Sequence, residues 1–520
     1  MALLQVVLFL MLCAVALGWV ARHFKFPYPI ALVIGGGALG FVPRLPQLQF
    51  DPQFVLVLVL PPILYQAALL TSWRDFKASA RPIGLLAIGL VIVTTLAVGA
   101  ALKLLIPDIP WAAAFVLGAI VSPPDAVAAT AILSRLNIPR RVATILEGES
   151  LVNDASGLVI YKFAVATVLT GVFSLWHASL DFVGVAVGGV VIGLVMGRLF
   201  VFIHRQLGDA FIEVLTTPAV PYVAYILAES LHMSGVLAVV AAGLVRGRYS
   251  PEIVSAETRI IARSVWNLLV FLLNTLIFML IGMQLSGIVA RLADYSVAQL
   301  FFYGTFVSAV AITVRFAWVY PATYLPLVWK ARRGEQVEPP LPGEVFIMGW
   351  CGMRGIVSLA AALALPVTLE DGNAFPERDL IIFLTFVVIA VTLVLQGLTL
   401  KPLIRVLRLG TDWSFQEERQ RAKMALGKAA IAAIDALMEK EGIPNELAER
   451  IRAEFAEKIT LSIPQGLVLS HSGADSAKRL REAAVKAERQ ELIRVWRENR
   501  ISDEVLHHLE EDLDYQESRI

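Results

Sequence analysis

Two short segments decide the fold, and both interrupt long apolar stretches of the sequence. The first reads VSPPD at residues 121–125, and the second reads GWCGMRG at residues 349–355. Proline removes a backbone donor and clashes with the preceding helical turn, and glycines weaken a helix interior. We therefore expect an interrupted helix at each place. Its unwound backbone must be buried in protein or line a cavity, because lipid cannot satisfy backbone polar groups.

The surrounding composition is that of a membrane protein. Of the 520 residues, 57% are hydrophobic and 17% are charged, with a mean hydropathy of +0.71 and a net charge of +1. Soluble domains carry about 25% charged residues. These values exclude a soluble enzyme, a disordered chain and a nucleic-acid binder. The two cysteines lie in apolar runs, which excludes a disulfide framework and cysteine-based zinc.

Apolar segments long enough to span a bilayer as helices repeat along the chain. Thirteen spans are predicted, at residues 3–22, 28–43, 52–71, 82–106, 111–134, 142–170, 179–203, 209–230, 232–248, 264–288, 297–326, 344–369 and 378–401. Lys and Arg number 16 in the loops of one side and 4 in those of the other. This bias predicts an external N-terminus and a cytoplasmic C-terminus in the cell (plasma) membrane.

Charge concentrates at the end of the chain, where residues 411–520 hold 39 charged residues. We expect a transmembrane domain over residues 1–405 and a cytoplasmic α-helical domain over residues 411–520. The tail contains no nucleotide loop, metal motif or catalytic constellation. It is either a regulatory or dimer-supporting domain, or a solvated amphipathic segment without a role in transport.

The interrupted helices are the fifth and twelfth of the predicted spans. If spans 1–6 and 8–13 are two repeats, the break falls in the fifth helix of each, and the odd offset makes the repeats opposite in topology. Paired interrupted helices in inverted repeats indicate the midplane site of a secondary transporter. The alternative is two unrelated kinks. The predicted fold is an all-α polytopic membrane protein with two inverted six-helix repeats and two broken helices that cross at the midplane.

The densest polar cluster is EGESLVND at residues 147–154, at the start of the sixth span. On a helix, Ser150 and Asp154 share one face, and Glu149 and Asn153 share the neighbouring face. Carboxylate, hydroxyl and carbonyl oxygens suit hard cations such as Na⁺. The cluster therefore predicts a site for such a cation.

The first broken helix adds oxygens to this predicted site. Asp125 brings a carboxylate, and Pro124 retains its carbonyl. We expect Na⁺ at Asp154, Asp125 and Ser150. Alternatively, Asp125 compensates the partial charges of the helix ends. The membrane-domain histidines lie in or near loops and lack metal-ligand spacing, so no transition-metal site is expected.

Two arginines, Arg315 and Arg354, lie within predicted spans. Arg cannot deprotonate, so each needs a partner when buried. One acid pairs with Arg315, Glu149 being the preferred choice, and Arg354 compensates the helix ends at the break. Substrate binding is the alternative for both arginines. Asp154 is then the acid without a fixed counter-charge, able to hold a proton or a cation in turn, unless it pairs with Lys162.

Several segments resemble the NhaP/NHE-type monovalent cation/proton antiporter family, which includes bacterial-type Na⁺/H⁺ antiporters. They are LPPILY at 60–65, SPPDAVA at 122–128, GESLVND at 148–154, SGVLA at 234–238, FLLN at 271–274 and GMRGIVS at 352–358. The resemblance covers about residues 1–405 and implies inverted repeats, a core domain that moves against a dimerisation domain, and homodimers. By position, it assigns ion or proton binding to Asp154, Asp125, Ser150 and the Pro124 carbonyl. It assigns a buried structural ion pair to Glu149 and Arg315, and places Arg354 on the second broken helix.

Two positions affect what this resemblance implies. The family usually has Glu where this chain has Gln66, so only an amide oxygen is available there, which leaves the Na⁺ or K⁺ preference open. Related electrogenic antiporters have a second aspartate at the position of Asn153. With an amide there, one titratable acid remains, which implies electroneutral exchange of one proton per cation.

The predicted function is therefore Na⁺/H⁺ antiport without a cofactor, by a protein that we expect to be a homodimer in the lipid bilayer. K⁺/H⁺ exchange on the same scaffold is the nearest alternative, and Li⁺ is a further candidate ion. A channel is another option, which the paired breaks disfavour. The rival from another class is an intramembrane aspartyl protease that uses Asp125 and Asp154. Its typical Tyr-Asp and Gly-x-Gly-Asp motifs are not found around these residues, and we expect no enzyme activity.

Overall fold

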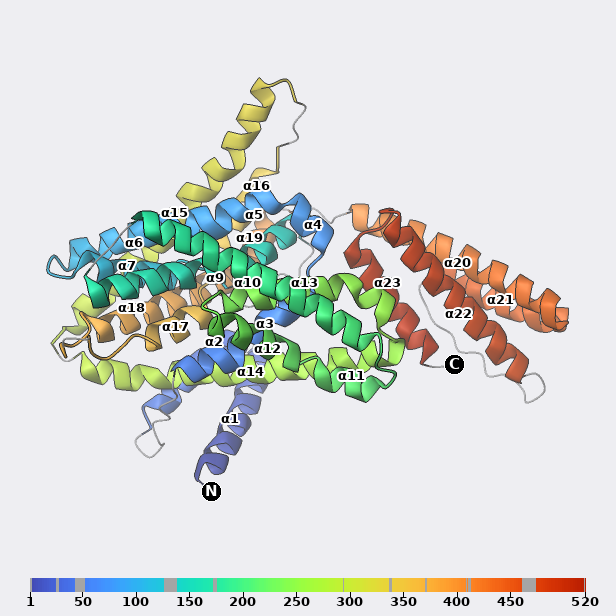
Figure 1. Cartoon of the computed structure of the whole chain (residues 1–520), viewed down its shortest axis with the longest axis horizontal. Coiled ribbons are helices and arrows are strands. Elements are labelled where there is room, and N and C mark those ends of the chain that lie inside the picture. Colours follow the sequence, from blue (N-terminus) through green and yellow to red (C-terminus); the bar gives the residue numbers. More distant parts are fainter. Residues whose placement is uncertain are drawn as a thin grey trace. The chain divides into compact units, whose positions relative to one another are not determined.

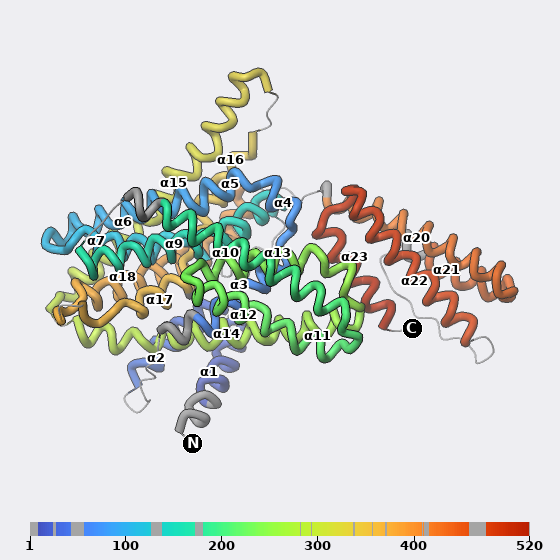
Figure 2. Tube along the Cα trace, in the orientation of Figure 1, coloured from blue at the N-terminus to red at the C-terminus, as the bar shows by residue number. Residues whose placement is uncertain are grey.

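The computed structural model describes most of the 520-residue chain, and Figure 2 follows its path. The described residues are 2–24, 28–42, 52–125, 138–171, 175–292, 294–335, 339–369, 372–407, 409, 413–460, 474–518 and 520. The end of the predicted span 111–134 lies outside them, as do the last three residues of the motif at 122–128. Regular secondary structure in the described ranges is helical, beside an isolated bridge between Thr368 and Ala374.

The chain divides into two compact units. Unit 1 comprises Met1–Phe200, Thr217–Gly247 and Trp266–Thr411. Unit 2 comprises Val201–Thr216, Arg248–Val265 and Asp412–Ile520. This division differs from a single boundary after residue 405, because two short pieces of the preceding chain pack with the last helices.

Unit 1 holds the apolar helices of the chain (Figure 1). Its first half contains α1 (Ala2–Phe24), α2 (Tyr28–Gly40), α3 (Pro52–Leu70), α4 (Trp73–Ala78), α5 (Ala80–Gly84), η1 (Leu85–Leu90), α6 (Val91–Leu105), α7 (Trp111–Val121), α9 (Arg140–Thr170) and most of α10 (Leu175–His204). Its second half contains α12 (Ala219–Ser230), most of α13 (Gly235–Ile253) and α14 (Ala256–Arg291), then α15 (Val297–Arg332), α16 (Pro342–Trp350), α17 (Ile356–Leu363), α18 (Arg378–Val391), η2 (Thr392–Gln396) and α19 (Gly397–Val406).

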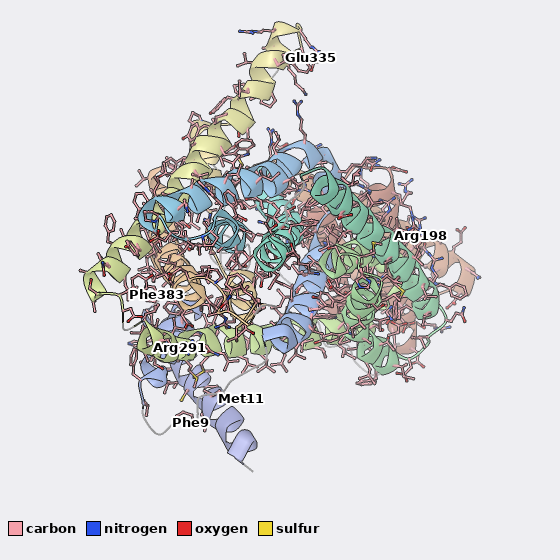
Figure 3. All side chains as sticks on the ribbon, turned by 60° about the vertical axis from the view of Figure 1, so that its left-hand side comes forward. Phe9, Met11, Arg198, Arg291, Glu335 and Phe383 are labelled. Carbon is pink, nitrogen blue, oxygen red and sulfur yellow. The ribbon has the colours of Figure 1, made fainter. Side chains whose placement is uncertain are left out.

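Many of these helices have the length and apolar composition of membrane spans. Seven in the described ranges meet both conditions: Ala80–Leu105, Arg140–Thr170, Leu180–His204, Ala210–Ser230, Ala256–Arg291, Val297–Arg332 and Arg378–Val406. Shorter apolar helices cover Phe9–His23, Tyr28–Gly40, Val57–Leu70 and Trp111–Val121. Exposed apolar side chains such as Phe9 and Met11 on α1 (Figure 3) are suited to contact lipid. The protein is therefore a multi-pass membrane protein, while the number thirteen and the inverted repeats stay predictions.

Helix boundaries differ from the predicted spans in a systematic way. α14 begins at Ala256 rather than at residue 264, and α15 continues to Arg332 rather than ending at residue 326. The predictions follow apolar composition, whereas these helices continue into polar flanks. The predicted span 209–230 contains two helices, α11 (Ala210–Thr216) and α12, which begins just after Pro218.

Small residues allow close helix packing in unit 1. α6, α7 and α9 lie side by side (Figure 1). A Cβ atom at Gly118 of α7 would lie 2.2 Å from the carbonyl oxygen of Thr95 in α6. Only glycine fits there, as is common where membrane helices approach closely.

Four helices of unit 2 form a bundle at the end of the chain (Figure 1): α20 (Trp413–Glu441), α21 (Asn445–Thr460), α22 (Ala474–Arg497) and α23 (Asp503–Glu517). Their apolar residues recur at helical spacing and gather in one core, which includes Ile434, Phe455, Leu480 and Leu509. Burial of such amphipathic faces is what stabilises helices of this length in water.

A buried network of charges fastens α23 to the beginning of α14 inside unit 2. Arg259 donates to both carboxylate oxygens of Asp514, at 2.6 and 2.8 Å, and lies 3.2 Å from Glu510. Arg489 of α22 also donates to Asp514, at 2.8 Å. Because Arg259 and Asp514 are both buried, loss of one partner would leave the other charge unpaired.

We predict that acid loosens this contact through His507 of α23. Burial lowers the pKa of His507, and Arg263 and Arg259 add to this effect against the opposing charge of Asp503. Below the ordinary pKa of about 6.5, the detached helix then binds a proton that the docked helix does not. Docking free energy is therefore lost as the pH falls through that value.

The measurement is hydrogen exchange of α23 in the full chain, compared between the wild type and His507→Gln at each pH. Protection of α23 should fall more in the wild type than in the variant as the pH is lowered from about 7.5 to about 5.5. Glu510, whose pKa is raised by burial, is present in both proteins and does not contribute to the difference. Equal losses of protection in both proteins would contradict the prediction.

Candidate functional site

The first interruption ends α7 at Val121. Ser122 follows as its C-terminal cap, and its hydroxyl donates to the carbonyl of Ala119 at 3.0 Å. The two prolines that come next cannot continue the hydrogen-bond ladder of the helix. The chain from Ser122 to Asp125 is non-helical and mostly buried, as the sequence pattern predicts.

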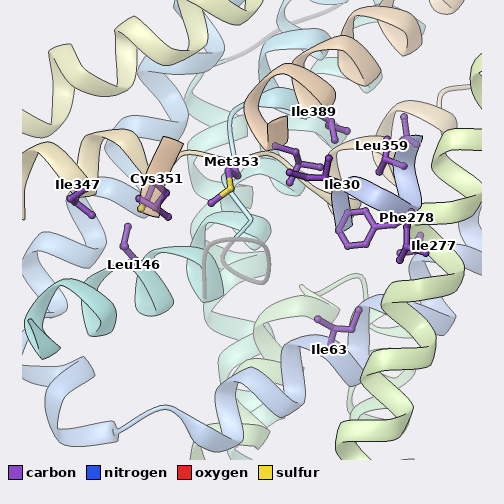
Figure 4. Packing of buried hydrophobic residues seen from close by; sticks show 14 of the residues in the cluster. Ile30, Ile63, Leu146, Ile277, Phe278, Ile347, Cys351, Met353, Leu359 and Ile389 are labelled. Atoms are coloured by element: carbon purple, nitrogen blue, oxygen red, sulfur yellow. The ribbon is translucent and has the colours of Figure 1, made fainter. Parts of the chain in front are cut away.

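The second interruption separates α16 from α17. α16 ends at Trp350 and α17 begins at Ile356, so residues 351–355 are unwound. Figure 4 shows Cys351 and Met353 on this segment, with Leu146 of α9 and Ile347 of α16 in the same buried apolar cluster. Both interruptions therefore lie within the packed interior of unit 1.

The two unwound segments touch each other. The N–H of Asp125 donates to the carbonyl of Met353 at 2.7 Å. A Cβ atom at Gly355 would lie 1.6 Å from a carboxylate oxygen of Asp125. Only glycine can occupy position 355 while Asp125 keeps this position. The crossing of two broken helices is thus a direct contact between their backbones.

Arg354 joins the same crossing. Its Nε donates to the carbonyl of Val121, the last residue of α7, at 2.9 Å, and its Nη1 donates to the carbonyl of Gly352. Carbonyls at helix C-termini lack intrahelical partners and carry partial negative charge. The fully buried guanidinium therefore compensates the end of the first broken helix from a position on the second.

Glu149 and Arg315 form a buried bidentate ion pair. The distances from Nη1 and Nη2 to the two carboxylate oxygens are 2.5 and 2.8 Å, and the Nε of Arg315 donates to the carbonyl of Met348 at 3.1 Å. Both side chains are at most 1% exposed. The pair connects α9, α15 and α16, so it holds the second broken helix against the helix that carries the acidic cluster.

Asp154 of α9 has neither a lysine nor an arginine partner in the described part of the chain. It is 6% exposed, and its carboxylate has no hydrogen bond or ion pair among the described residues. Lys162, the alternative partner, instead pairs with Glu229 at 3.0 Å. The charge that acts on Asp154 is that of Asp125, so the two acids lie near each other.

Asn153 ties the acidic cluster to the first break. Its Nδ2 donates to the carbonyl of Pro124 at 3.1 Å, and its buried Oδ1 has no partner among the described residues. Ser150 is half-buried on the same helix. The structure therefore brings the neighbourhoods of Asp125 and Asp154 together from helices that are separate in sequence.

Gln66 of α3 has a different neighbour. Its Nε2 donates to the Oδ1 of Asn267 in α14 at 3.3 Å. Gln66 is half-buried and Asn267 is exposed. The described contact of Gln66 is thus with another amide and not with the acids.

The sequence did not predict the contacts of two residues at the crossing. The hydroxyl of Thr392 accepts a hydrogen bond from the N–H of Arg354 at 3.1 Å, and Gly355 makes room for Asp125. The glycine lies in a conspicuous motif. Thr392 gave no signal, because a single threonine in an apolar helix more often bonds its own backbone. Within the described ranges, no group of three His, Cys, Asp or Glu is placed to hold a metal ion.

Interrupted helices that meet inside a bundle of apolar helices, with charged groups at their crossing, define a secondary transporter. The family described as "Sodium/hydrogen exchanger, transmembrane" matches residues 7–406. The chain belongs to this transmembrane sodium/hydrogen exchanger family.

Relatives support this assignment over most of the chain. An uncharacterized Na⁺/H⁺ exchanger of Mycobacterium bovis is 34% identical, over 99% of this chain and 96% of its own length. A sodium, potassium, lithium and rubidium/H⁺ antiporter of Bacillus pumilus is 32% identical, over 93% of this chain and 73% of its own length. The solved sodium proton antiporter MjNhaP1 of Methanocaldococcus jannaschii has a similar fold, with a TM-score of 0.62 and 20% identity over 78% of this chain and 98% of its own.

Removal of one partner of the Glu149–Arg315 pair should destabilise the protein strongly. We expect Glu149→Gln or Arg315→Met to lower the free energy of unfolding by about 3–5 kcal/mol, because each leaves a buried charge unpaired. Chemical unfolding in detergent measures this loss. As a matched control, Asp379→Asn breaks the exposed pair with Arg291 and should cost less than about 1 kcal/mol. Equal effects at the two pairs would contradict the prediction.

Proposed function

We propose that this protein exchanges one Na⁺ for one H⁺ by alternating access, with the carboxylate of Asp154 binding the two in turn. The observation that carries the proposal is the contrast between two acids of α9. Glu149 is held by Arg315, whereas Asp154 is buried without a partner among the described residues. A buried acid without a fixed counter-charge is stabilised by either a proton or a cation.

The Na⁺ site comprises the carboxylates of Asp154 and Asp125, the hydroxyl of Ser150 and the carbonyl of Pro124. Oxygen ligands of this kind suit a hard cation. Asn153 orients the Pro124 carbonyl through its hydrogen bond and has a further oxygen to offer. Glu149, Arg315 and Arg354 act as structural charges that fix the frame around this site.

K⁺/H⁺ exchange on the same scaffold is the second candidate. The Bacillus pumilus relative is named for sodium, potassium, lithium and rubidium, which favours a site that accepts several monovalent cations. Gln66 adds no carboxylate to the site, and its described contact is with the amide of Asn267. Transport in proteoliposomes with a pH dye, titrated in turn with Na⁺, Li⁺ and K⁺, distinguishes the two.

The remaining features of the proposal concern the assembly. The protein is a homodimer in the plasma membrane, with its N-terminus outside and residues 411–520 as a cytoplasmic domain. It needs no cofactor. The family is one of transporters, so the aspartyl protease alternative has lost its support.

Asp154→Asn should abolish cation-dependent proton flux and leave the protein folded. The amide has nearly the same shape but neither titrates nor neutralises a cation. Flux in proteoliposomes is the measurement, and melting in detergent reports the fold. Asp181→Asn makes the same chemical change at an exposed position on α10 and should leave flux unchanged. Flux through the Asp154 variant at the wild-type rate would refute the proposed site.

Exchange should move no net charge. Asn153 is neutral, so one acid exchanges one proton for one cation. A membrane potential acts on a transported charge with about 2.3 kcal/mol per 100 mV, and an electrogenic exchanger would respond strongly to it. Na⁺-driven pH changes should therefore be insensitive to a potential imposed with K⁺ and valinomycin, whereas Asn153→Asp should introduce sensitivity. A wild-type rate that scales with the potential would show that a second acid, first of all Asp125, also titrates.

A further inference from the structure

Gln396 is a buried amide at the end of η2, a π-helical turn between α18 and α19. Its side chain is 0% exposed, and neither its Nε2 nor its Oε1 has a hydrogen-bond partner among the described residues. Burial of an amide without partners costs free energy. Short π-helical turns often occur at functional sites. The burial of the unbonded Gln396 amide therefore requires an explanation.

The contacts of two neighbouring threonines indicate which segment this part of the helix meets. One turn before it, Thr392 accepts a hydrogen bond from the N–H of Arg354 at 3.1 Å. One turn after it, Thr399 accepts one from the indole of Trp350 at 2.9 Å. Residues spaced by three or four along a helix share a face. Gln396 thus lies between two threonines that contact Arg354 and Trp350, at the two ends of the unwound segment.

Some backbone groups of that segment are already bonded. The N–H groups of Cys351 and Gly352 donate to Ile347 and Trp350, and the carbonyls of Gly352 and Met353 accept from Arg354 and Asp125. The carbonyl of Cys351 and the N–H of Met353 have no partner within the described part of the chain. The segment therefore has one unbonded acceptor and one unbonded donor, and the amide of Gln396 has one donor group and one acceptor.

We propose that Gln396 is a positioning residue for exchange, whose amide bonds the unwound backbone at Cys351 and Met353 in the alternate state of the transporter. In the described state these groups are unbonded, so hydrogen bonds formed between them in the alternate state would stabilise that state and not the described one. A difference of this kind biases a two-state equilibrium. Gln396 touches no ion, and it acts through the second broken helix. The inference rests on the proposed antiport function.

Gln396→Leu tests the proposal, because leucine is of similar size and cannot form hydrogen bonds. The melting temperature in detergent should be equal to or above that of the wild type, since an unbonded polar group is removed from the interior. The maximal rate of Na⁺/H⁺ exchange in proteoliposomes should fall by about tenfold, because the alternate state loses the two hydrogen bonds of the amide. The half-saturating Na⁺ concentration should change by less than about twofold, because the site itself is intact.

Thr94→Val is the matched control. Thr94 of α6 is also 0% exposed with an unbonded hydroxyl in the described structure, and its helix is not one of the two that bracket Gln396. This variant should keep the wild-type exchange rate and stability. Gln396→Met provides a second, unbranched replacement and should behave as Gln396→Leu does.

Each outcome decides the proposal. Wild-type exchange rates in both Gln396 variants would overturn it. The proposed function would be unaffected by that result, because the wild-type protein would still exchange Na⁺ for H⁺. Loss of folding in both variants would also overturn it, because it would show that the amide is needed in the resting fold. Absence of transport in the wild type would instead refute the antiport function on which the inference rests.

Discussion

The contact between two unwound backbones is the constraint on which the rest of unit 1 depends. Peptide groups inside a membrane protein must be satisfied internally, and the two breaks do this in part for each other. Asp125 donates to Met353, and Arg354 caps the end of α7 at Val121. Gly355 allows the approach because any side chain there would overlap with Asp125. Each broken helix is therefore stable only with the other.

This crossing and the Glu149–Arg315 pair divide the charges of the interior into two groups. The pair and Arg354 are hydrogen-bonded and buried, so they fix positions of helices. Asp154 is left on α9 close to Asp125 and without a basic partner in the described structure. Because the fixed charges form a frame, Asp154 is the group whose charge state changes in the exchange that we propose.

The same helix that enters the interior of unit 1 also begins in unit 2. α14 carries Arg259 near its start, where α23 binds it through Asp514 and Glu510. The charged end of the chain is therefore packed against residues that precede it by about half the sequence, and not only against itself. A buried ion pair of this kind specifies one docking geometry, since either charge alone would be costly.

The sequence by itself determined the membrane class, the helical fold, the two breaks and the polar cluster of α9. Each follows from local rules: apolar length, proline and glycine chemistry, and helical spacing. Three features required the tertiary structure: the partner of Lys162, the approach of Gly355 to Asp125, and the bonding of Thr392 to Arg354. They depend on which helix faces meet, and a residue such as Thr392 looks like any other threonine of an apolar helix. The division into units also differs from the boundary near residue 405 that composition predicts. Arg259 pairs with Asp514, which is distant in the sequence, because the fold brings the two side chains together.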